Sequence, residues 1–233
     1  MVAVADKVVV VTGGRRGLGS ALVDEVLQRG VRKVYSTARQ AYSDTRPGVV
    51  TRELEVRSQD SVTALADEAG DAEIVINNAG ILLPDSLLTG RMDDVDATFD
   101  VNVFGPLRVV RAFAPILARN GGGAIVNVHS VLSWLGGSGA YGASKAAAWS
   151  LTNSLRAELQ QQNTQVLGVH AGFIDTAMVA DINLPKTPPH VVAKRIVDAL
   201  EDGAVEVLAD DVTVAAKAAL SGPVENLTFA LAR

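Results

Sequence analysis

Residues 8–19, VVVVTGGRRGLG, decide the fold of this chain. Four consecutive valines belong to a predicted strand, Lys7–Val11, that runs into closely spaced glycines, and the apolar helical pattern of Leu18–Gln28 follows. Glycines permit a sharp turn and a close backbone approach, while a helix N-terminus offers N–H donors and the positive end of a dipole. This strand, loop and helix predict a phosphate-binding site. The alternative is a glycine-rich turn that binds nothing.

Short β-branched runs alternate with longer helical segments along the rest of the chain. Strands are expected at Lys7–Val11, Lys33–Thr37, Val50–Val56, Glu73–Asn77, Ala124–Val128, Gln165–His170 and Glu206–Leu208, and helices at Leu18–Gln28, Ser61–Ala69, Met92–Arg119, Ala140–Gln162 and Val191–Glu201. Strand runs such as VVVV and IVIN are apolar without alternation, which is typical of a parallel sheet covered by helices on both faces. We therefore expect an α/β fold, a doubly wound parallel sheet of the Rossmann-like type in three α/β/α layers, as one domain over residues 1–233.

Composition excludes several classes of function. The chain has 233 residues and a net charge of −5, which argues against nucleic acid as a partner because phosphate binding needs clustered Lys and Arg. It has no cysteine, and its three histidines, His129, His170 and His190, are spread along the chain, so no metal site is expected. The N-terminus lacks the apolar region of a signal peptide and no membrane-spanning run stands out, so we expect a cytoplasmic protein.

Five motifs occur in an order known from one family. They are Thr12-Gly13-Gly14-Arg15-Arg16-Gly17-Leu18-Gly19, Asn77-Asn78-Ala79-Gly80, Asn102, Ser130 and Tyr141-Gly142-Ala143-Ser144-Lys145. The chain resembles the short-chain dehydrogenase/reductase family over nearly its whole length. The resemblance implies an oxidoreductase that binds a nicotinamide dinucleotide. It assigns cofactor contacts to Gly13, Gly17, Leu18 and Gly19 of the glycine loop and to Asn78, Ala79 and Gly80 after the fourth strand.

Tyr141 and Lys145 are four residues apart at the start of a helix, so both project from one face. Carbonyl reduction needs a hydride at carbon and a proton at oxygen; a tyrosine can donate that proton, and a lysine beside it lowers its pKa toward the working pH. The resemblance adds that Lys145 bonds the nicotinamide ribose, that Ser130 holds the substrate oxygen and that Asn102 retains a water. Two alternatives stay open: Ser130 as a loop cap, and Asn102 as a helix-interior side chain bonded to backbone. His129 is assigned to packing.

The residues after the second strand decide between NAD and NADP. That strand ends in Thr37-Ala38-Arg39, without the acid that usually accepts the ribose hydroxyls of NAD. Arg16 and Arg39 match positions that bind the 2′-phosphate in NADP-preferring relatives, and guanidinium groups suit phosphate oxygens. Arg15 either contributes or is solvated. We therefore predict NADP(H) as cofactor, with Glu55 and Val56 near the adenine in place of the family's usual Asp.

The segment His170–Thr176 resembles the family's Pro-Gly-x-x-x-Thr motif, which implies that the Ile174 backbone and the Thr176 hydroxyl orient the nicotinamide. Ala171 replaces the usual proline, so we expect a less rigid loop. An apolar substrate pocket is expected, and each of its residues could equally be core or subunit contact. The candidates are Leu82, Leu83, Val131, Leu132, Trp134, Leu135, Phe173, Met178 and Ile182. The short connection after Thr176 predicts an open site.

These observations predict an NADPH-dependent reductase that converts an apolar ketone or aldehyde to an alcohol. The alternatives are a non-catalytic NADP-binding sensor on the same fold, and an epimerase or dehydratase with tightly held NAD, whose usual glycine spacing and larger C-terminal domain are absent. The family also pairs its long helices between copies, so we expect a homodimer or homotetramer. The interface would use Ala146, Ala147, Trp149 and Leu155.

Overall fold

Seven parallel strands form one sheet in the order β3-β2-β1-β4-β5-β6-β7. The structure, a computed structural model, describes residues 2–83 and 86–228. The strands are β1 (Val8–Val11), β2 (Lys33–Ala38), β3 (Val49–Glu53), β4 (Ile74–Asn77), β5 (Gly123–Val128), β6 (Thr164–His170) and β7 (Glu206–Leu208). The helices are α1 (Gly17–Gln28), α2 (Gln59–Glu68), α3 (Met92–Phe99), α4 (Gly105–Arg119), α5 (Gly139–Leu159), α6 (Pro189–Glu201) and α7 (Asp211–Ala219). The predicted doubly wound α/β sheet is confirmed.

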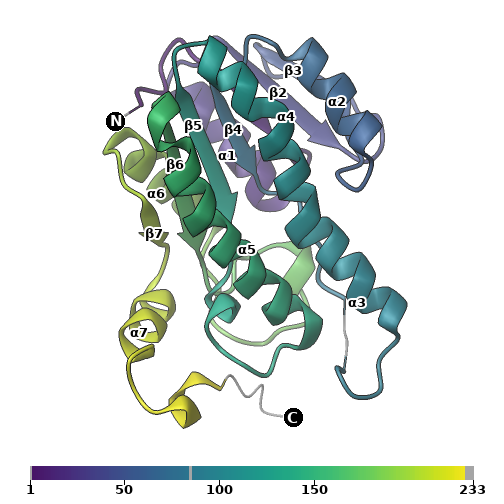
Figure 1. The fold of residues 1–233 in the computed structure, drawn as a ribbon, viewed down its shortest axis with the longest axis vertical. Helices are drawn as coiled ribbons and strands as arrows, with labels where there is room; N and C mark the ends of the chain where they lie inside the picture. Colours follow the sequence, from purple (N-terminus) through teal and green to yellow (C-terminus); the bar gives the residue numbers. More distant parts are fainter. Residues whose placement is uncertain (1, 84–85, 229–233) are drawn as a thin grey trace.

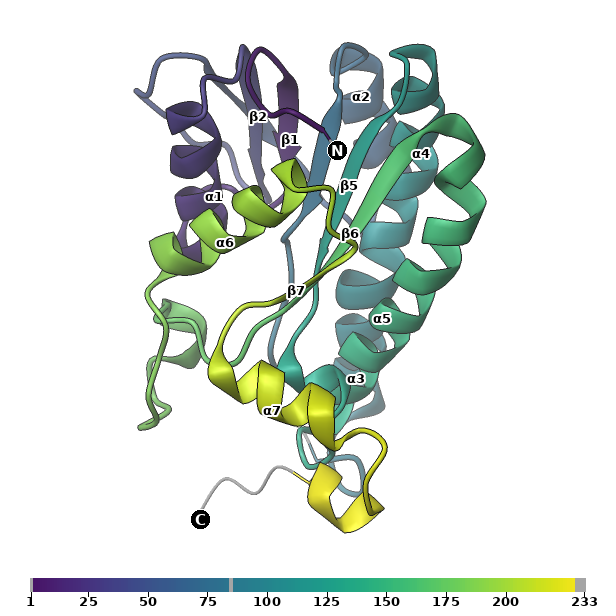
Figure 2. The same cartoon turned by 90° about the vertical axis from the view of Figure 1, so that its left-hand side faces the viewer.

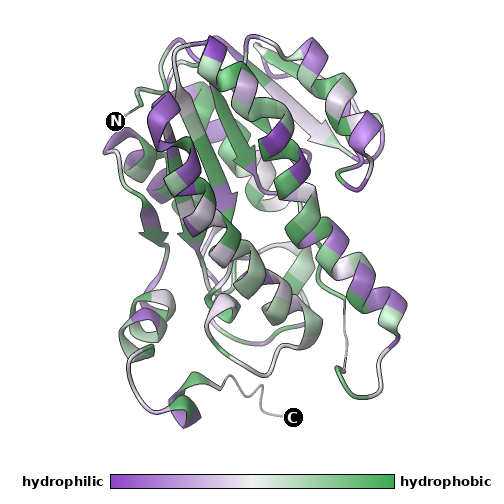
Figure 3. Cartoon of the chain, in the orientation of Figure 1, coloured by the Kyte–Doolittle hydropathy of each residue, from purple (hydrophilic) through white to green (hydrophobic). Residues whose placement is uncertain are grey.

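Helices cover both faces of the sheet, as the unbroken apolar strands predict. Figures 1 and 2 show α1 and α6 on one face and α2, α4 and α5 on the other. In Figure 3 the central strands are coloured mainly as hydrophobic, whereas the helices carry both kinds of residue. The three layers therefore follow from amphipathic helices packed on a doubly buried sheet.

Alternate strand residues supply two separate halves of the core. Val9 and Val11 of β1 pack with α1 and α6, whereas Val8 and Val10 pack with α2 and α4. Successive side chains of a strand point to opposite faces, so one run of valines serves both layers. Phe113 of α4 is completely buried in the second cluster.

The predicted single helix over Met92–Arg119 is divided into three parts. Between α3 and α4 the backbone forms a π-helical turn, Asp100–Phe104, that contains Asn102. At Gly105, a Cβ would come within 2.9 Å of Val56, so a glycine is needed where α4 begins. A π turn holds one more residue than an α turn, and such turns are frequent at functional sites.

Met92–Arg119 is also the one stretch among the described residues long and apolar enough to cross a membrane by length and composition. Half of its most apolar window is buried inside the protein, and α4 packs on the sheet against β4 and β5. Burial of this kind is typical of the core helix of a globular domain.

Helix α7 is an element that the sequence analysis does not predict. Asp210 caps it by accepting from the backbone N–H of Thr213 at 2.9 Å, and the Thr213 hydroxyl oxygen accepts from the Asp210 N–H in return. This reciprocal capping box is a readable start signal for a helix. Ala216 of α7 closes a small apolar cluster with Trp134 and Trp149. Trp149 and Leu155, expected at a subunit interface, thus pack within the chain. Association of copies stays a prediction.

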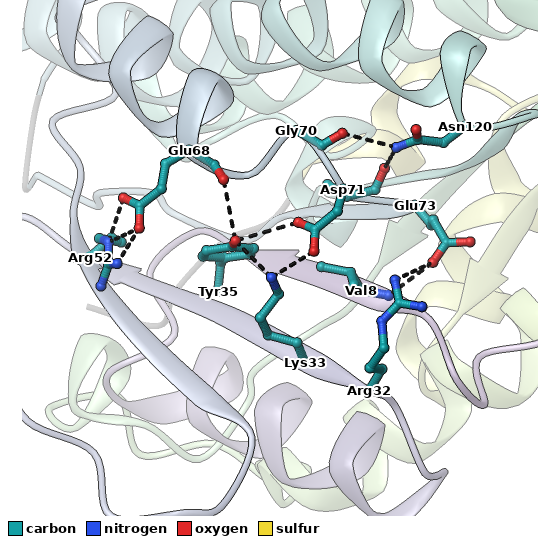
Figure 4. A network of polar contacts seen from close by, with 11 residues as sticks. Val8, Arg32, Lys33, Tyr35, Arg52, Glu68, Gly70, Asp71, Glu73 and Asn120 are labelled. Carbon is teal, nitrogen blue, oxygen red and sulfur yellow. Dashed lines mark hydrogen bonds and ion pairs between the residues drawn. The ribbon is translucent and has the colours of Figure 1, made fainter.

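A network of polar contacts links the amino ends of the central strands (Figure 4). Lys33, the first residue of β2, donates to Asp71 at 2.6 Å and to the hydroxyl oxygen of Tyr35 at 2.9 Å. Glu73, just before β4, accepts from the backbone N–H of Val8 at 3.2 Å. Partly exposed pairs of this kind contribute little stability each. They link the amino ends of the strands, at the end of the sheet opposite the glycine loop.

Core packing makes a testable prediction for stability. Phe113→Ala removes a completely buried ring and leaves a cavity, so we expect the free energy of unfolding to fall by roughly 3–5 kcal/mol. Leu88→Ala, at a residue 95% exposed, is the matched control and should change it by less than about 0.5 kcal/mol. Denaturant titration measures both; equal losses would contradict the assignment of Phe113 to the core.

Candidate active site

All the strands are parallel, so their carboxyl ends meet at one edge of the sheet, and the predicted site residues gather there. The strand arrows in Figure 1 point toward this edge, at the end of the molecule where α3 and α7 lie. Residues that follow β1, β2, β4, β5 and β6 are Gly13, Arg39, Asn78, Ser130 and Ala171, in that order. The chain runs outward from β1 to β2 and β3, then returns to β4 on the other side. This switch in direction opens a crevice above β1 and β4, where ligands bind in such sheets.

The glycine loop lies close against its surroundings. A Cβ on Gly19 would stand 2.0 Å from the carbonyl oxygen of Gly13, so the first turn of α1 lies directly on the loop. Gly17 has a φ of +58°, and its α-carbon faces the methyl group of Thr176. A side chain at position 19 would collide with the loop backbone, and one at position 17 would be strained by the positive φ.

Thr12 and Asn78 hold the loop in place across β1 and β4. The Thr12 hydroxyl oxygen accepts from the backbone N–H groups of Asn78 and Ala79, each at 3.0 Å. The Asn78 side-chain amide donates to the carbonyl oxygens of Thr12 at 3.0 Å and Gly13 at 3.2 Å. The predicted cofactor residue Asn78 is therefore engaged with the loop itself.

The N-terminus of α1 has the features that an anion site needs. Arg16 occupies the cap position, no described side chain caps the helix, and its first turn holds no acid. The N–H groups of this turn thus keep their donor capacity, and the helix dipole favours negative charge. Together with the glycine cradle, these residues fit the pyrophosphate of a dinucleotide.

Arg15, Arg16 and Arg39 have exposed side chains at this end of the sheet. The guanidinium carbon of Arg15 lies 5.8 Å from the centre of the Tyr42 ring. Tyr42 donates its hydroxyl proton to the Ser36 hydroxyl oxygen at 2.6 Å. Sequence reasoning does not find Tyr42, because it lies in an irregular loop where neither spacing nor periodicity marks a contact.

Glu55 and Val56, expected near an adenine, are engaged within the protein. The Glu55 carboxylate accepts from Arg57 at 2.8 Å; this bond, helped by the charge of Arg39, lowers the pKa of Glu55. Val56 is buried against Gly105 at the start of α4. Contact of either residue with a base stays a prediction.

Tyr141 and Ser130 are hydrogen-bonded through their side chains. Burial raises the pKa of the Tyr141 phenol to about 12, and the bond with Ser130 acts in the opposite direction. Ser130 also caps the turn after β5, because its hydroxyl oxygen accepts from the N–H of Leu132 at 3.2 Å. Ser130 is therefore a loop cap that also faces the tyrosine. Its contact with a substrate oxygen stays a prediction.

Lys145 reaches the same point from the next turn of α5. Its Nζ donates to the carbonyl oxygen of Val128 at 2.9 Å and lies 5.7 Å from the centre of the Tyr141 ring. Burial lowers the pKa of the Lys145 ammonium to about 8. The predicted spacing of four residues does bring the two side chains together.

Asn102 is a helix-interior side chain bonded to the backbone, which is the alternative given from the sequence. Its Oδ1 accepts from the N–H of Ile81 at 2.9 Å, and its Nδ2 donates to the Ile81 carbonyl at 3.0 Å and to the Ser144 hydroxyl at 3.1 Å. Gly80 leaves room for this contact, since a Cβ there would lie 3.2 Å from Oδ1. The amide ties the loop after β4 to α5, and the retention of a water stays a prediction.

The loop after β6 is fixed although it lacks the proline. The N–H of Gly172 donates to Asp210 Oδ2 at 2.6 Å. Farther along, Ile174 pairs with Thr187, and the N–H of Asp175 donates to the Thr187 carbonyl at 2.9 Å. The predicted loss of rigidity at Ala171 is thus offset by Asp210, which also caps α7.

The residues of the predicted apolar lining differ in exposure and form three groups. Val131 and Trp134 are buried in the cluster that packs on α7, which is the core alternative. Met178 is 49% exposed. The other six, Leu82, Leu83, Leu132, Leu135, Phe173 and Ile182, are partly buried. In the described part of the chain no group of three or more His, Asp or Glu could hold a metal.

Comparison with known proteins agrees with this geometry. Residues 7–187 match the family model described as short chain dehydrogenase. The chain belongs to the short-chain dehydrogenase/reductase family. Because this family consists of oxidoreductases, the chain is an oxidoreductase.

Relatives and solved structures cover most of the chain. An "uncharacterized oxidoreductase" of Staphylococcus saprophyticus is 28% identical over 86% of this short-chain dehydrogenase and 94% of the relative, and one of Staphylococcus epidermidis is 32% identical over 76% and 82%. A short chain dehydrogenase of Burkholderia cenocepacia, solved in complex with NADP, has a TM-score of 0.91 with 36% identity over 96% of each chain. One from Burkholderia phymatum, in complex with NAD, shares the fold with a TM-score of 0.87 and 24% identity.

Burial of Lys145 makes a prediction for stability against pH. Its pKa of about 8 lies below the ordinary value of 10.5, so between these values the unfolded chain holds more protons and stability rises with pH. Below about pH 8 the buried charge costs on the order of 3 kcal/mol. Lys145→Met should therefore stabilise the cofactor-free protein at pH 7, with the gain vanishing above about pH 10.5. Denaturant titrations across this range check it; a gain that does not depend on pH would contradict the cause.

Proposed function

We propose that this short-chain dehydrogenase uses NADPH to reduce an apolar ketone or aldehyde to an alcohol. The observation that carries the proposal is the side-chain bond between Ser130 and Tyr141, with the Lys145 amine beside the tyrosine ring. This set offers a proton donor, a hydrogen-bond donor and a positive charge at one point of the crevice.

Residues of the glycine loop and of the end of β2 support NADP as the cofactor. Arg16 and Arg39 are exposed beside the glycine loop, and Ala38 stands where an NAD-preferring enzyme usually has an acid. The Burkholderia cenocepacia protein, which is 36% identical, was solved with NADP. When bound, NADPH supplies the hydride that the carbonyl carbon receives.

Tyr141 supplies the proton in this proposal. With a pKa of about 12, the phenol is protonated at neutral pH and can donate to a carbonyl oxygen as negative charge develops there. Ser130 shares the same oxygen through its hydroxyl group, which stabilises that charge. The ammonium of Lys145, with a pKa of about 8, still carries charge near neutrality and favours the tyrosinate that remains.

The substrate side favours apolar compounds. Partly buried leucines follow β4 and the turn after β5, and Phe173 and Ile182 follow β6. The connection between Thr176 and α6 is short and contains one 3₁₀ turn, Ala177–Val179. A short connection supports an open site that accepts bulky groups.

Cofactor preference is tested by exchanging the residues at the end of β2. Ala38→Asp with Arg39→Ala places an acid where a 2′-phosphate would lie, so the Kd for NADPH should rise at least roughly 10-fold while that for NADH falls. Fluorescence titration measures both constants. Arg32→Ala, at the opposite sheet edge, is the control and should change neither. Equal affinity of the parent protein for NADH and NADPH would refute the preference.

The proton donor is tested by Tyr141→Phe, assayed with a panel of aldehydes, ketones and quinones. We expect NADPH binding to be retained and turnover to fall on the order of 10²–10⁴-fold, because the ring stays and only the acid is lost. Tyr35→Phe, in the network of Figure 4, is the control and should keep its turnover. Full activity of Tyr141→Phe would place the acid elsewhere. Tight NADPH binding by a parent protein that reduces no compound of the panel would favour the sensor.

A further inference from the structure

The end of β6 holds both neighbours of Ser130 through backbone hydrogen bonds. The N–H of His129 donates to the carbonyl oxygen of Val169 at 2.7 Å, and the N–H of Val131 donates to that of Ala171 at 2.8 Å. Ser130 lies between these bonds, beyond the last residue of β5. These two bonds hold the backbone on either side of Ser130, and contacts of Ser130 itself add to them.

One of these contacts comes from the side chain of His170, the last residue of β6. The Nδ1 of His170 lies 3.2 Å from the carbonyl oxygen of Ser130. A carbonyl oxygen can only accept, so Nδ1 must carry the proton of this bond. The same oxygen accepts from the N–H of Ser133 at 3.0 Å, within the turn. Among the bonds that Ser130 itself makes in the described part of the chain, the one from His170 is the one that comes from β6.

The imidazole is held firmly by aromatic rings. His170 is completely buried, with its ring centre 3.9 Å from that of Trp134 and the two planes 19° apart, which is a stacked arrangement. Trp149 meets the ring edge-on at 6.2 Å. A stacked, enclosed ring does not turn freely, so the direction of Nδ1 is fixed.

The His170 ring is neutral, because it is buried and Nε2, on its opposite side, is not hydrogen-bonded to a described residue. Nε2 lies 3.9 Å from a carboxylate oxygen of Glu206, but that oxygen accepts from Lys217 at 2.8 Å, and Nε2 has no hydrogen-bond partner among the described residues. Burial lowers the pKa of His170 to about 4. A neutral ring with its one proton on Nδ1 suits donation to Ser130.

We propose that His170 is a positioning residue, which holds Ser130 for its contact with Tyr141 by donating Nδ1–H to the Ser130 carbonyl oxygen. This inference rests on the proposed reductase function. Packing alone needs an aromatic or apolar side chain of similar size at position 170; the bond needs a donor at the δ position. The two roles are therefore separable by substitution.

The experiment compares His170→Leu with His170→Asn, in the enzyme assayed with NADPH and its best substrate of the panel. Leu fills space but donates nothing, so kcat should fall on the order of 10-fold while the Kd for NADPH stays unchanged. The Nδ2 of Asn is as far along the side chain as the Nδ1 of His, so His170→Asn should recover kcat to within about 2-fold. His129→Leu is the matched control: a neighbouring buried histidine, 5.1 Å from His170, whose ring nitrogens bond no described residue. It should keep the parental kcat.

Parental kcat in His170→Leu, an equal loss in His170→Asn, or an equal loss in His129→Leu would each overturn the proposal.

A measurement that needs no turnover separates the positioning role from the proposed function. It is nitrogen NMR of ring-labelled histidine, with the His170 signal identified by its loss in His170→Asn. The expected result is a neutral ring protonated at Nδ1, and protonation at Nε2 instead would overturn the proposal. If the parent protein reduces nothing while the ring is protonated at Nδ1, the reductase function fails. In that case the pH titration of Tyr141 decides the positioning role: His170→Leu should raise its pKa and His170→Asn should not, and equal pKa values would overturn it.

Discussion

The divergence of the chain on either side of β1 and β4 is the constraint on which the rest of the structure depends. Two neighbouring parallel strands whose continuations leave in opposite directions cannot close over their own carboxyl ends. The gap is spanned by short polar bonds, from Thr12 on one strand and Asn78 on the other, instead of by apolar packing. Beside these bonds α1 begins without a side-chain cap from the described residues, so the N–H groups of its first turn keep donor capacity. The predicted catalytic and cofactor-binding residues follow the carboxyl ends of the strands, at the same end of the sheet.

A second constraint is the cost of placing charged and polar groups in a well-packed interior. Lys145 is buried and Tyr141 is partly buried beside it. Desolvation raises the pKa of the tyrosine and lowers that of the lysine, which favours the neutral form of each. The two large apolar clusters of the core lie on the two faces of the sheet. The stability that this packing contributes offsets the unfavourable free energy of burying the Lys145 amine.

The sheet and most of its helices could be predicted because their signals are local. Runs of valine and isoleucine, a glycine loop and a Tyr–Lys pair at helical spacing each act over a few residues. What the sequence did not reveal depends on contacts distant in the chain. The π turn at Asn102 arises where α4 approaches Val56, Tyr42 meets Arg15 from an irregular loop, and Trp134 turns inward because α7 covers it. Helix α7 itself had a signal in its capping box, but the segment is too short for periodicity to mark it.

The carboxylate of Asp210 has a consequence for which substitutions this fold can accept. One of its oxygens accepts from the helix N–H of Thr213 and the other from the N–H of Gly172, so the residue needs two separate acceptors. Asparagine, which commonly replaces aspartate at helix caps, has one carbonyl oxygen and would have to give up either the helix or the loop. Position 210 is therefore coupled to position 171. Among homologues we expect an asparagine cap to occur together with a proline that stiffens the loop by covalent means, and an alanine such as Ala171 to require the acid.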